Sequence, residues 1–96
     1  MNMFIWDAAK AISNFEKHGI SFEEAATVFA DEHGLDWEDT DHSHQEKRYK
    51  RVGRASTGYT VLVVYTLRRT EGGQEKIRII SARQANRNER KAYTGP

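Results

Sequence analysis

The spacing of the apolar residues changes from a helical to an extended period at Gly34, and this change restricts the chain to a mixed α+β fold. Before Gly34, apolar residues recur three and four positions apart. After it, extended segments are separated by short turns rich in Gly, Ser, Asp and Glu. A chain of 96 residues can build only one small core, so we predict a single domain spanning residues 1–96.

Two short helices are predicted before Gly34. Asp7 is a good N-cap for the first helix, and Gly19 follows its last residues. The apolar face expected for this helix consists of Ala8, Ala11, Ile12 and Phe15. Ser21 with Glu24 has the capping-box spacing, so a second helix is expected to start immediately afterwards.

The remainder of the chain predicts an antiparallel sheet, because its extended segments are joined by short connections. The expected strands are Leu35 to Glu38, Arg48 to Arg54, Tyr59 to Arg68 and Glu75 to Ala82. Met3 to Trp6 also has the composition of a short strand, and Asn86 with Glu89 predicts a short C-terminal helix. The predicted fold is therefore two N-terminal helices packed on a four-stranded antiparallel meander, followed by a third helix.

The charge of the chain is divided between its two halves. Residues 1–46 carry two cations and eleven acids, whereas residues 47–96 carry thirteen cations and three acids, giving net charges of −9 and +10. Clustered arginine indicates an anionic partner, of which nucleic acid is the commonest. The alternative is that the two halves neutralise each other in the folded protein.

The basic residues of the second half are expected to form one face of the sheet. Arg48, Lys50 and Arg54 alternate along one strand and so point the same way. In the last strand the alternation places Ile77, Ile79 and Ser81 on one face and Arg78, Ile80 and Ala82 on the other. Further possible RNA contacts at or beyond the strand end are Arg83, Arg87 and Arg90. Tyr49, Tyr59 and Tyr65 are expected nearby, where they would stack bases; the alternative is that the cations only protect a sheet edge.

A second polar stripe is predicted on the first helix, opposite Ala8, Ile12 and Phe15. It contains Lys10, Asn14, Lys17 and His18. Lysine and histidine can transfer protons and stabilise a developing phosphorane during RNA cleavage. Stabilisation of the helix dipole by cations in the last turn is the alternative explanation for Lys17 and His18.

The segment DTDHSH, residues 39–44, contains Asp39, Asp41, His42 and His44, all of which are possible metal ligands. Its composition is typical of a capped turn, and the helical H-E-x-x-H spacing of a zinc site is missing. The sequence has no Gly-rich phosphate loop and no G-x-S-x-G motif. We therefore predict no metal and no cofactor.

The sequence contains no cysteine, which suits a reducing compartment and favours the cytoplasm. Its longest apolar run, Val61 to Tyr65, is much shorter than the ~20 residues of a membrane-spanning helix. The N-terminal residues lack the pattern of a signal peptide. We expect a protein without membrane association.

Three stretches of this sequence resemble the BrnT toxins of bacterial type II toxin–antitoxin systems. They are WDAAKAISNFEKHGISFEEAATVFAD at residues 6–31, DHSHQEKRYKRVGRAS at residues 41–56 and KIRIISARQANRNERKAY at residues 76–93. The resemblance implies a RelE-like fold and a ribonuclease that halts translation. It also implies a BrnA-like antitoxin that forms a hetero-oligomer, such as a heterotetramer, with the toxin. This complex would repress its own promoter through the DNA-binding part of the antitoxin.

The family pattern falls on twelve positions of this chain. They are Trp6, Asp7, Lys10, Asn14, Lys17, His18, Gly19, Arg54, Arg78, Ser81, Arg83 and Arg90. RelE-like toxins generally work with a basic cluster and without a metal, so we predict that Arg78 and Arg83 bind the scissile phosphate. Proton transfer is assigned to His18 or Lys17, and RNA positioning to Arg54. The alternative function is a non-catalytic nucleic-acid-binding or regulatory subunit with the same fold.

Overall fold

The computed structural model describes residues 3–95 and confirms an α+β fold. Its helices are α1 (Ala8–His18), α2 (Phe22–Thr27) and α3 (Arg87–Thr94), with single 3-10 turns η1 (Val28–Ala30) and η2 (Thr40–His42). Its strands are β1 (Phe4–Ile5), β2 (Leu35–Glu38), β3 (Tyr49–Arg54), β4 (Thr60–Arg69) and β5 (Glu75–Gln84). The helices α1, α2 and α3 therefore occur where the capping residues and apolar spacing predict them.

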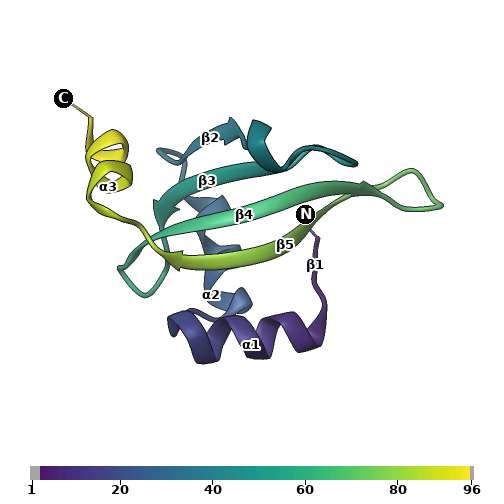
Figure 1. Ribbon diagram of the computed structural model, residues 1–96, viewed down its shortest axis with the longest axis horizontal. Helices are drawn as coiled ribbons and strands as arrows, with labels where there is room; N and C mark the ends of the chain where they lie inside the picture. Colours follow the sequence, from purple (N-terminus) through teal and green to yellow (C-terminus); the bar gives the residue numbers. More distant parts are fainter. Residues whose placement is uncertain (1–2, 96) are drawn as a thin grey trace.

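The sheet has five strands in the order β1-β5-β4-β3-β2 and is mixed (Figure 1). Strands β2 to β5 form the expected antiparallel meander. The four-stranded, purely antiparallel prediction was wrong at one edge, because β1 pairs in parallel with β5. A two-residue strand whose partner lies at the other end of the chain leaves no periodic signal from which this pairing can be predicted.

One face of the sheet is covered by α2 and η1, which lie behind the strands in Figure 1. The core between these layers contains Ile20, Phe22, Ala25, Val28, Val61, Val63, Ile79 and Ala82. Ser21 caps α2 by accepting a hydrogen bond from the Glu24 N–H at 3.0 Å. The Glu24 carboxylate does not complete a capping box; it accepts from the Thr57 hydroxyl at 2.5 Å and ties α2 to the β3–β4 turn.

Helix α1 lies along the edge of β5 (Figure 1). Of its predicted apolar face, Ala11 packs against the core, whereas Ala8, Ile12 and Phe15 are exposed. Asn14 is 8% exposed, whereas Ile12 and Phe15 are 63% and 55% exposed. The Asn14 amide nitrogen donates to the carbonyls of Ala82 (2.9 Å) and Ile20 (3.0 Å), and its oxygen accepts from the Ala82 N–H (3.1 Å). Because β1 pairs only with Ile77 and Arg78, the β5 edge at Ala82 is not paired with a strand and can bind the Asn14 amide.

An irregularity in β5 reverses the predicted alternation of its side chains. Tyr65 and Val64 are consecutive in β4 but pair with Ile79 and Ser81, which leaves Ile80 as an additional residue, a β-bulge. Beyond the bulge, Ala82 joins the core and Ser81 points to the opposite face, contrary to the strict alternation predicted from sequence.

Candidate nucleic-acid interface and active site

The face of the sheet opposite α2 carries a cluster of cations from three strands. Directly opposed residues of antiparallel strands point to the same side, and the register therefore places Lys50 with Val64, Arg83 with Leu62, and Arg78 with Thr66 on this face. Arg68 pairs with Lys76 in the same row. We call this surface the basic face, and its members are Arg48, Lys50, Arg54, Arg68, Lys76, Arg78 and Arg83.

The β5 bulge is the reason why Arg78 and Arg83 share the basic face. They are five residues apart, so a regular strand would direct their side chains to opposite sides of the sheet. The additional residue Ile80 brings the side chains of Arg78 and Arg83 back to the same side of the sheet. Bulges are often found next to active sites, where they redirect a side chain in this way.

Two cations of the basic face form ion pairs. Arg83 donates to both carboxylate oxygens of Glu89 in α3, at 2.8 and 2.9 Å. Burial of Glu89 opposes its charged form, but the hydrogen bonds from Arg83 and from the Asn86 N–H outweigh this effect and hold its pKa below the usual range. Arg68 pairs with Glu46 at 3.3 Å. Within residues 3–95, Arg48, Lys50 and Arg78 make no ion pair and their charges are available to a ligand.

A hollow of about 250 Å³ opens on the basic face over β3, β4 and β5. Its apolar floor consists of Leu62, Val64 and Ile80. The polar groups around it are Asp39, His42, Arg48, Lys50, Ser81 and Arg83. Cations from two strands and a histidine from the preceding loop thus converge on one depression, an arrangement suited to bind a phosphate and to transfer a proton next to it.

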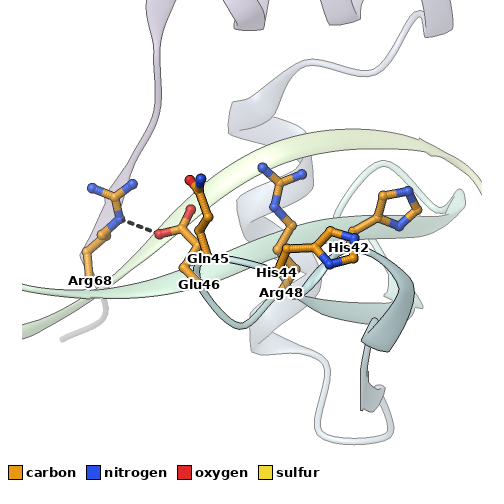
Figure 2. Close-up of a pocket in the computed structure, with 6 residues that line it drawn as sticks. All are labelled: His42, His44, Gln45, Glu46, Arg48 and Arg68. Atoms are coloured by element: carbon orange, nitrogen blue, oxygen red, sulfur yellow. Dashed lines mark ion pairs between the residues drawn. The ribbon is translucent and has the colours of Figure 1, made fainter.

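The histidine belongs to the loop between β2 and β3. His42 Nδ1 lies 2.9 Å from Asp39 Oδ2, and Asp39 is 8% exposed while the His42 side chain is 64% exposed. A second hollow, of about 520 Å³, adjoins the first because both are lined by His42 and Arg48. Figure 2 shows its other lining residues, with the Arg68–Glu46 ion pair at the end remote from His42.

The cations predicted on α1 lie on the side of this helix that faces away from α2. At 100° per residue, Lys10 and Lys17 lie on one side of the buried Asn14, and Ala11 and Phe15 lie on the other. Ala11 packs against the core beneath α2, so Lys10 and Lys17 are turned toward the basic face. In Figure 1, α1 and β5 run in the same direction. Asn14 bonds Ala82, and Lys17 follows Asn14 by three residues of helix. The helical rise over these residues equals roughly one strand residue, so Lys17 lies near the level of Arg83.

The other predicted site residues lie at the margins of the basic face or outside it. His18 is exposed at the end of α1 and does not line either hollow. Arg54 is exposed at the end of β3, and its N–H donates to Asp31 at 2.8 Å. Arg87 and Arg90 are exposed on α3, beyond the end of β5 (Figure 1).

Two of the three tyrosines predicted to stack bases, Tyr49 and Tyr65, do not lie on the basic face. Tyr49 and Tyr65 stack on each other at 5.5 Å on the helix-covered side of the sheet, where Tyr65 also packs edge-on against Phe29. Arg51 lies on that side too, over the Phe29 ring, and donates to the Val28 and Asp31 carbonyls. Arg51 is therefore a structural cation, and only Tyr59 of the three tyrosines is substantially exposed, at 52%.

Sequence reasoning missed the pairing of His42 with Asp39, because it considered these residues only as turn formers or metal ligands. The D-x-x-H spacing is the signal that could have indicated it, since one 3-10 turn brings residues i and i+3 to the same side. In the described part of the chain, no group of three or more His, Asp or Glu side chains gathers as a metal site. No helix there is long and apolar enough to cross a membrane.

The fold and the site define a small α+β protein with α2 on one face of its sheet and, on the other face, a basic hollow beside α3. The fold is similar to that of a solved structure, the Brucella abortus ribonuclease toxin BrnT, which has 19% sequence identity and a TM-score of 0.63 to this chain. The match covers 91% of this chain and 100% of that toxin. No curated protein matches.

A family model gives the more specific assignment. Residues 6–89 match the family described as "Ribonuclease toxin, BrnT, of type II toxin-antitoxin system". This chain therefore belongs to the BrnT family of ribonuclease toxins, as the resemblance of its three sequence stretches predicted.

Proposed function

We propose that this protein is a metal-independent endoribonuclease toxin that stops translation by cleaving RNA and that a BrnA-like antitoxin neutralises it. The observation that carries the proposal is the hollow on the basic face, where Lys50, Arg48 and Arg83 surround a histidine. In RNA cleavage by the 2′-hydroxyl, negative charge accumulates on the phosphate, and fixed cations stabilise it. Lysine and arginine supply here the positive charge that other nucleases take from a metal.

Arg78 and Lys50 are proposed to bind the scissile phosphate, because both lie on the basic face without an ion pair in the described residues. Arg83 is proposed to contact the same phosphate while Glu89 holds its guanidinium in place. The RNA backbone would continue over the outer cations of the surface. These are Lys10, Lys17, Arg48, Arg54, Arg87 and Arg90. Proton transfer by Lys17 or His18 stays a prediction; of these two, Lys17 lies nearer the level of the hollow.

The antitoxin is proposed to anchor on the exposed side of α1. Ile12 and Phe15 border a hollow of about 470 Å³ that continues over Ser21 and Phe22 of the next helix. Glu16 and Glu23 line the same hollow and make no ion pair within residues 3–95. This combination fits an amphipathic segment with apolar side chains flanked by lysine or arginine. The resulting complex would act in the cytoplasm and bind operator DNA through the antitoxin.

Expression of the chain alone in bacteria tests the toxin function, with growth and total RNA followed together. Arg78→Ala is the informative variant, because its side chain makes no hydrogen bond or ion pair in the described structure and its loss should leave the fold intact. Arg69→Ala is a matched control, since Arg69 is an exposed cation of the same strand pair and points to the other face. We expect wild type and Arg69→Ala to arrest growth and degrade RNA, and Arg78→Ala to do neither.

Arg83→Ala is a less direct test, because it also removes the ion pair that anchors α3. Unimpaired growth and intact RNA in cells containing folded wild-type protein would contradict the proposal and favour a non-catalytic binding subunit. Melting curves of each purified variant separate loss of activity from loss of folding.

A further inference from the structure

We propose that His42 is the general base of RNA cleavage and that Asp39 is its positioning residue. This inference rests on the proposed ribonuclease function and identifies the group that starts the reaction. The geometry that carries it is a histidine at the wall of the basic hollow, paired with a buried carboxylate and surrounded by cations.

The loop that carries His42 is held on the basic face by a set of short hydrogen bonds. The Asp39 N–H donates to the Arg48 carbonyl at 2.7 Å, which closes the loop at its base. The Ser43 hydroxyl donates to the Asp39 carbonyl at 2.7 Å and accepts from the Arg48 N–H at 3.0 Å. The Thr66 hydroxyl of β4 donates to the Lys47 carbonyl at 2.7 Å. The position of His42 is therefore determined by the sheet beneath it.

The contact with Asp39 selects the ring tautomer of His42. A carboxylate only accepts hydrogen bonds, so Nδ1 must carry the proton that it donates to Asp39 Oδ2 at 2.9 Å. In the neutral imidazole, Nε2 then has a free lone pair. The imidazole is 64% exposed, whereas the carboxylate that orients it is shielded from water. This combination of an accessible base and a buried orienting carboxylate is the arrangement of acid–base histidines in hydrolytic sites.

The charged groups around His42 suit an RNA phosphate. Asp39 faces Nδ1, while Lys50 of β3, Arg83 of β5 and Arg48, which immediately precedes β3, line the hollow. A phosphodiester bound by these cations would place its adjacent 2′-hydroxyl within the reach of the imidazole. His18, the histidine predicted from sequence, lines neither hollow and makes no ion pair in the described structure.

In the proposed reaction, His42 Nε2 removes the proton of the 2′-hydroxyl as the 2′-oxygen attacks phosphorus. The bond between phosphorus and the 5′-oxygen breaks, and the leaving oxygen takes a proton from the Lys50 ammonium, which lines the hollow. In this inference His42 and Lys50 take the proton-transfer role that the sequence assigned to His18 or Lys17. The products are a 2′,3′-cyclic phosphate and a 5′-hydroxyl. Protonated His42 and neutral Lys50 then return to their starting states by exchange with water.

The test is single-turnover cleavage of a labelled RNA oligonucleotide by excess purified protein. We expect His42→Ala to lower the rate constant by about 100-fold or more, which is the usual contribution of a general base. RNA affinity and melting temperature should change little, because the His42 side chain is mostly exposed. Asp39→Asn should give an intermediate rate with RNA affinity retained. His33→Ala is the control, because His33 is exposed and its one ion pair within residues 3–95 is with Glu32, and it should cleave as wild type does.

Imidazole in the buffer provides the readout that a structural role would not affect. The space left by His42→Ala is open to solvent, so we expect added imidazole to restore part of the lost rate and to leave wild type unchanged. Cleavage by His42→Ala at the wild-type rate would overturn the inference while leaving the ribonuclease function intact. A slow variant that imidazole does not rescue, and whose melting temperature or RNA affinity has fallen, would also overturn it. Wild type that cleaves no RNA would instead refute the proposed function, and this inference with it.

Discussion

Replacing Asn14 with alanine tests how α1 is attached to the sheet. The change removes three hydrogen bonds and leaves the Ala82 N–H, the Ala82 carbonyl and the Ile20 carbonyl without their partner. Each buried polar group left unsatisfied costs about 1–3 kcal/mol. Water can reach part of the vacated space, so we expect a total loss of about 2–4 kcal/mol in the free energy of unfolding.

Urea denaturation followed by circular dichroism measures this loss, with the slope of the transition showing whether the compactness of the states has changed. For a domain of this size, 1 kcal/mol corresponds to a shift of about 4–8 °C in the melting temperature. The predicted decrease is therefore on the order of 8–32 °C. Ile12→Ala is the matched control on the same helix, because Ile12 is 63% exposed, and it should change stability by less than about 0.5 kcal/mol.

A larger loss of stability for Ile12→Ala than for Asn14→Ala would contradict this prediction. If the apolar face predicted from sequence were the buried one, Ile12→Ala would cost more than Asn14→Ala. A loss of less than about 1 kcal/mol for Asn14→Ala would show that the Asn14 amide does not hold α1 at the β5 edge. Lys10 and Lys17 would then have no fixed orientation toward the basic face.

Three further results are expected. The N–H of Arg54 and the hydroxyl of Tyr93 lower the pKa of Asp31 from 3.8 to about 2. This carboxylate therefore stabilises the fold above pH ~4, and its contribution is lost as the pH falls toward 2. Wild type should be more stable than Asp31→Asn at pH 5, and the two should be equally stable at pH 2. Phe15→Asp should weaken antitoxin binding at least about tenfold in calorimetry without slowing RNA cleavage, whereas Leu67→Asp, at an exposed apolar residue elsewhere, should leave the affinity unchanged. RNA affinity should fall steeply with salt, and Lys50→Ala should reduce the slope of log K against log salt by about one if the Lys50 ammonium contacts a phosphate.

The helix boundaries could be predicted from sequence because their signals are local. Asp7, Ser21 and Asn86 each cap a helix by accepting from the N–H three residues later. In α3 the Glu89 carboxylate also accepts from the Asn86 N–H, which completes a capping box where the sequence predicted only a capped helix. The antiparallel order of β2 to β5 followed from short connections in the same way.

The orientation of α1 could not be predicted, because periodicity identifies an apolar stripe without showing what covers it. Ile12 and Phe15 have the spacing of a core face, yet the polar Asn14 is buried since it bonds the unpaired edge of β5. That edge exists only because β1 is two residues long and pairs with the far end of the chain. Both facts depend on tertiary contacts.

The composition of the basic face could be predicted in part. Lys50 and Arg54 follow a regular alternation and lie on one side of β3 as expected, and Arg48, just before the strand, lines the same hollow as Lys50. The bulge at Ile80, which brings Arg83 to the side of Arg78, has no sequence signal in a strand with three isoleucines and no glycine. The hollow with His42 depends on this bulge and on a loop folded back over the sheet, so sequence reasoning recognised its cations but not its histidine.

Mapping RNA onto the two faces of the sheet shows directly whether the basic face is the side that binds RNA. A ¹⁵N-labelled sample would be titrated with a short 2′-O-methylated RNA, which the chain cannot cleave because the attacking hydroxyl is blocked. We expect the largest amide shifts around the basic hollow, at Lys50, Ser81 and Arg83. Shifts confined to α2 on the opposite face, or no shifts at RNA concentrations that saturate a nuclease, would contradict it.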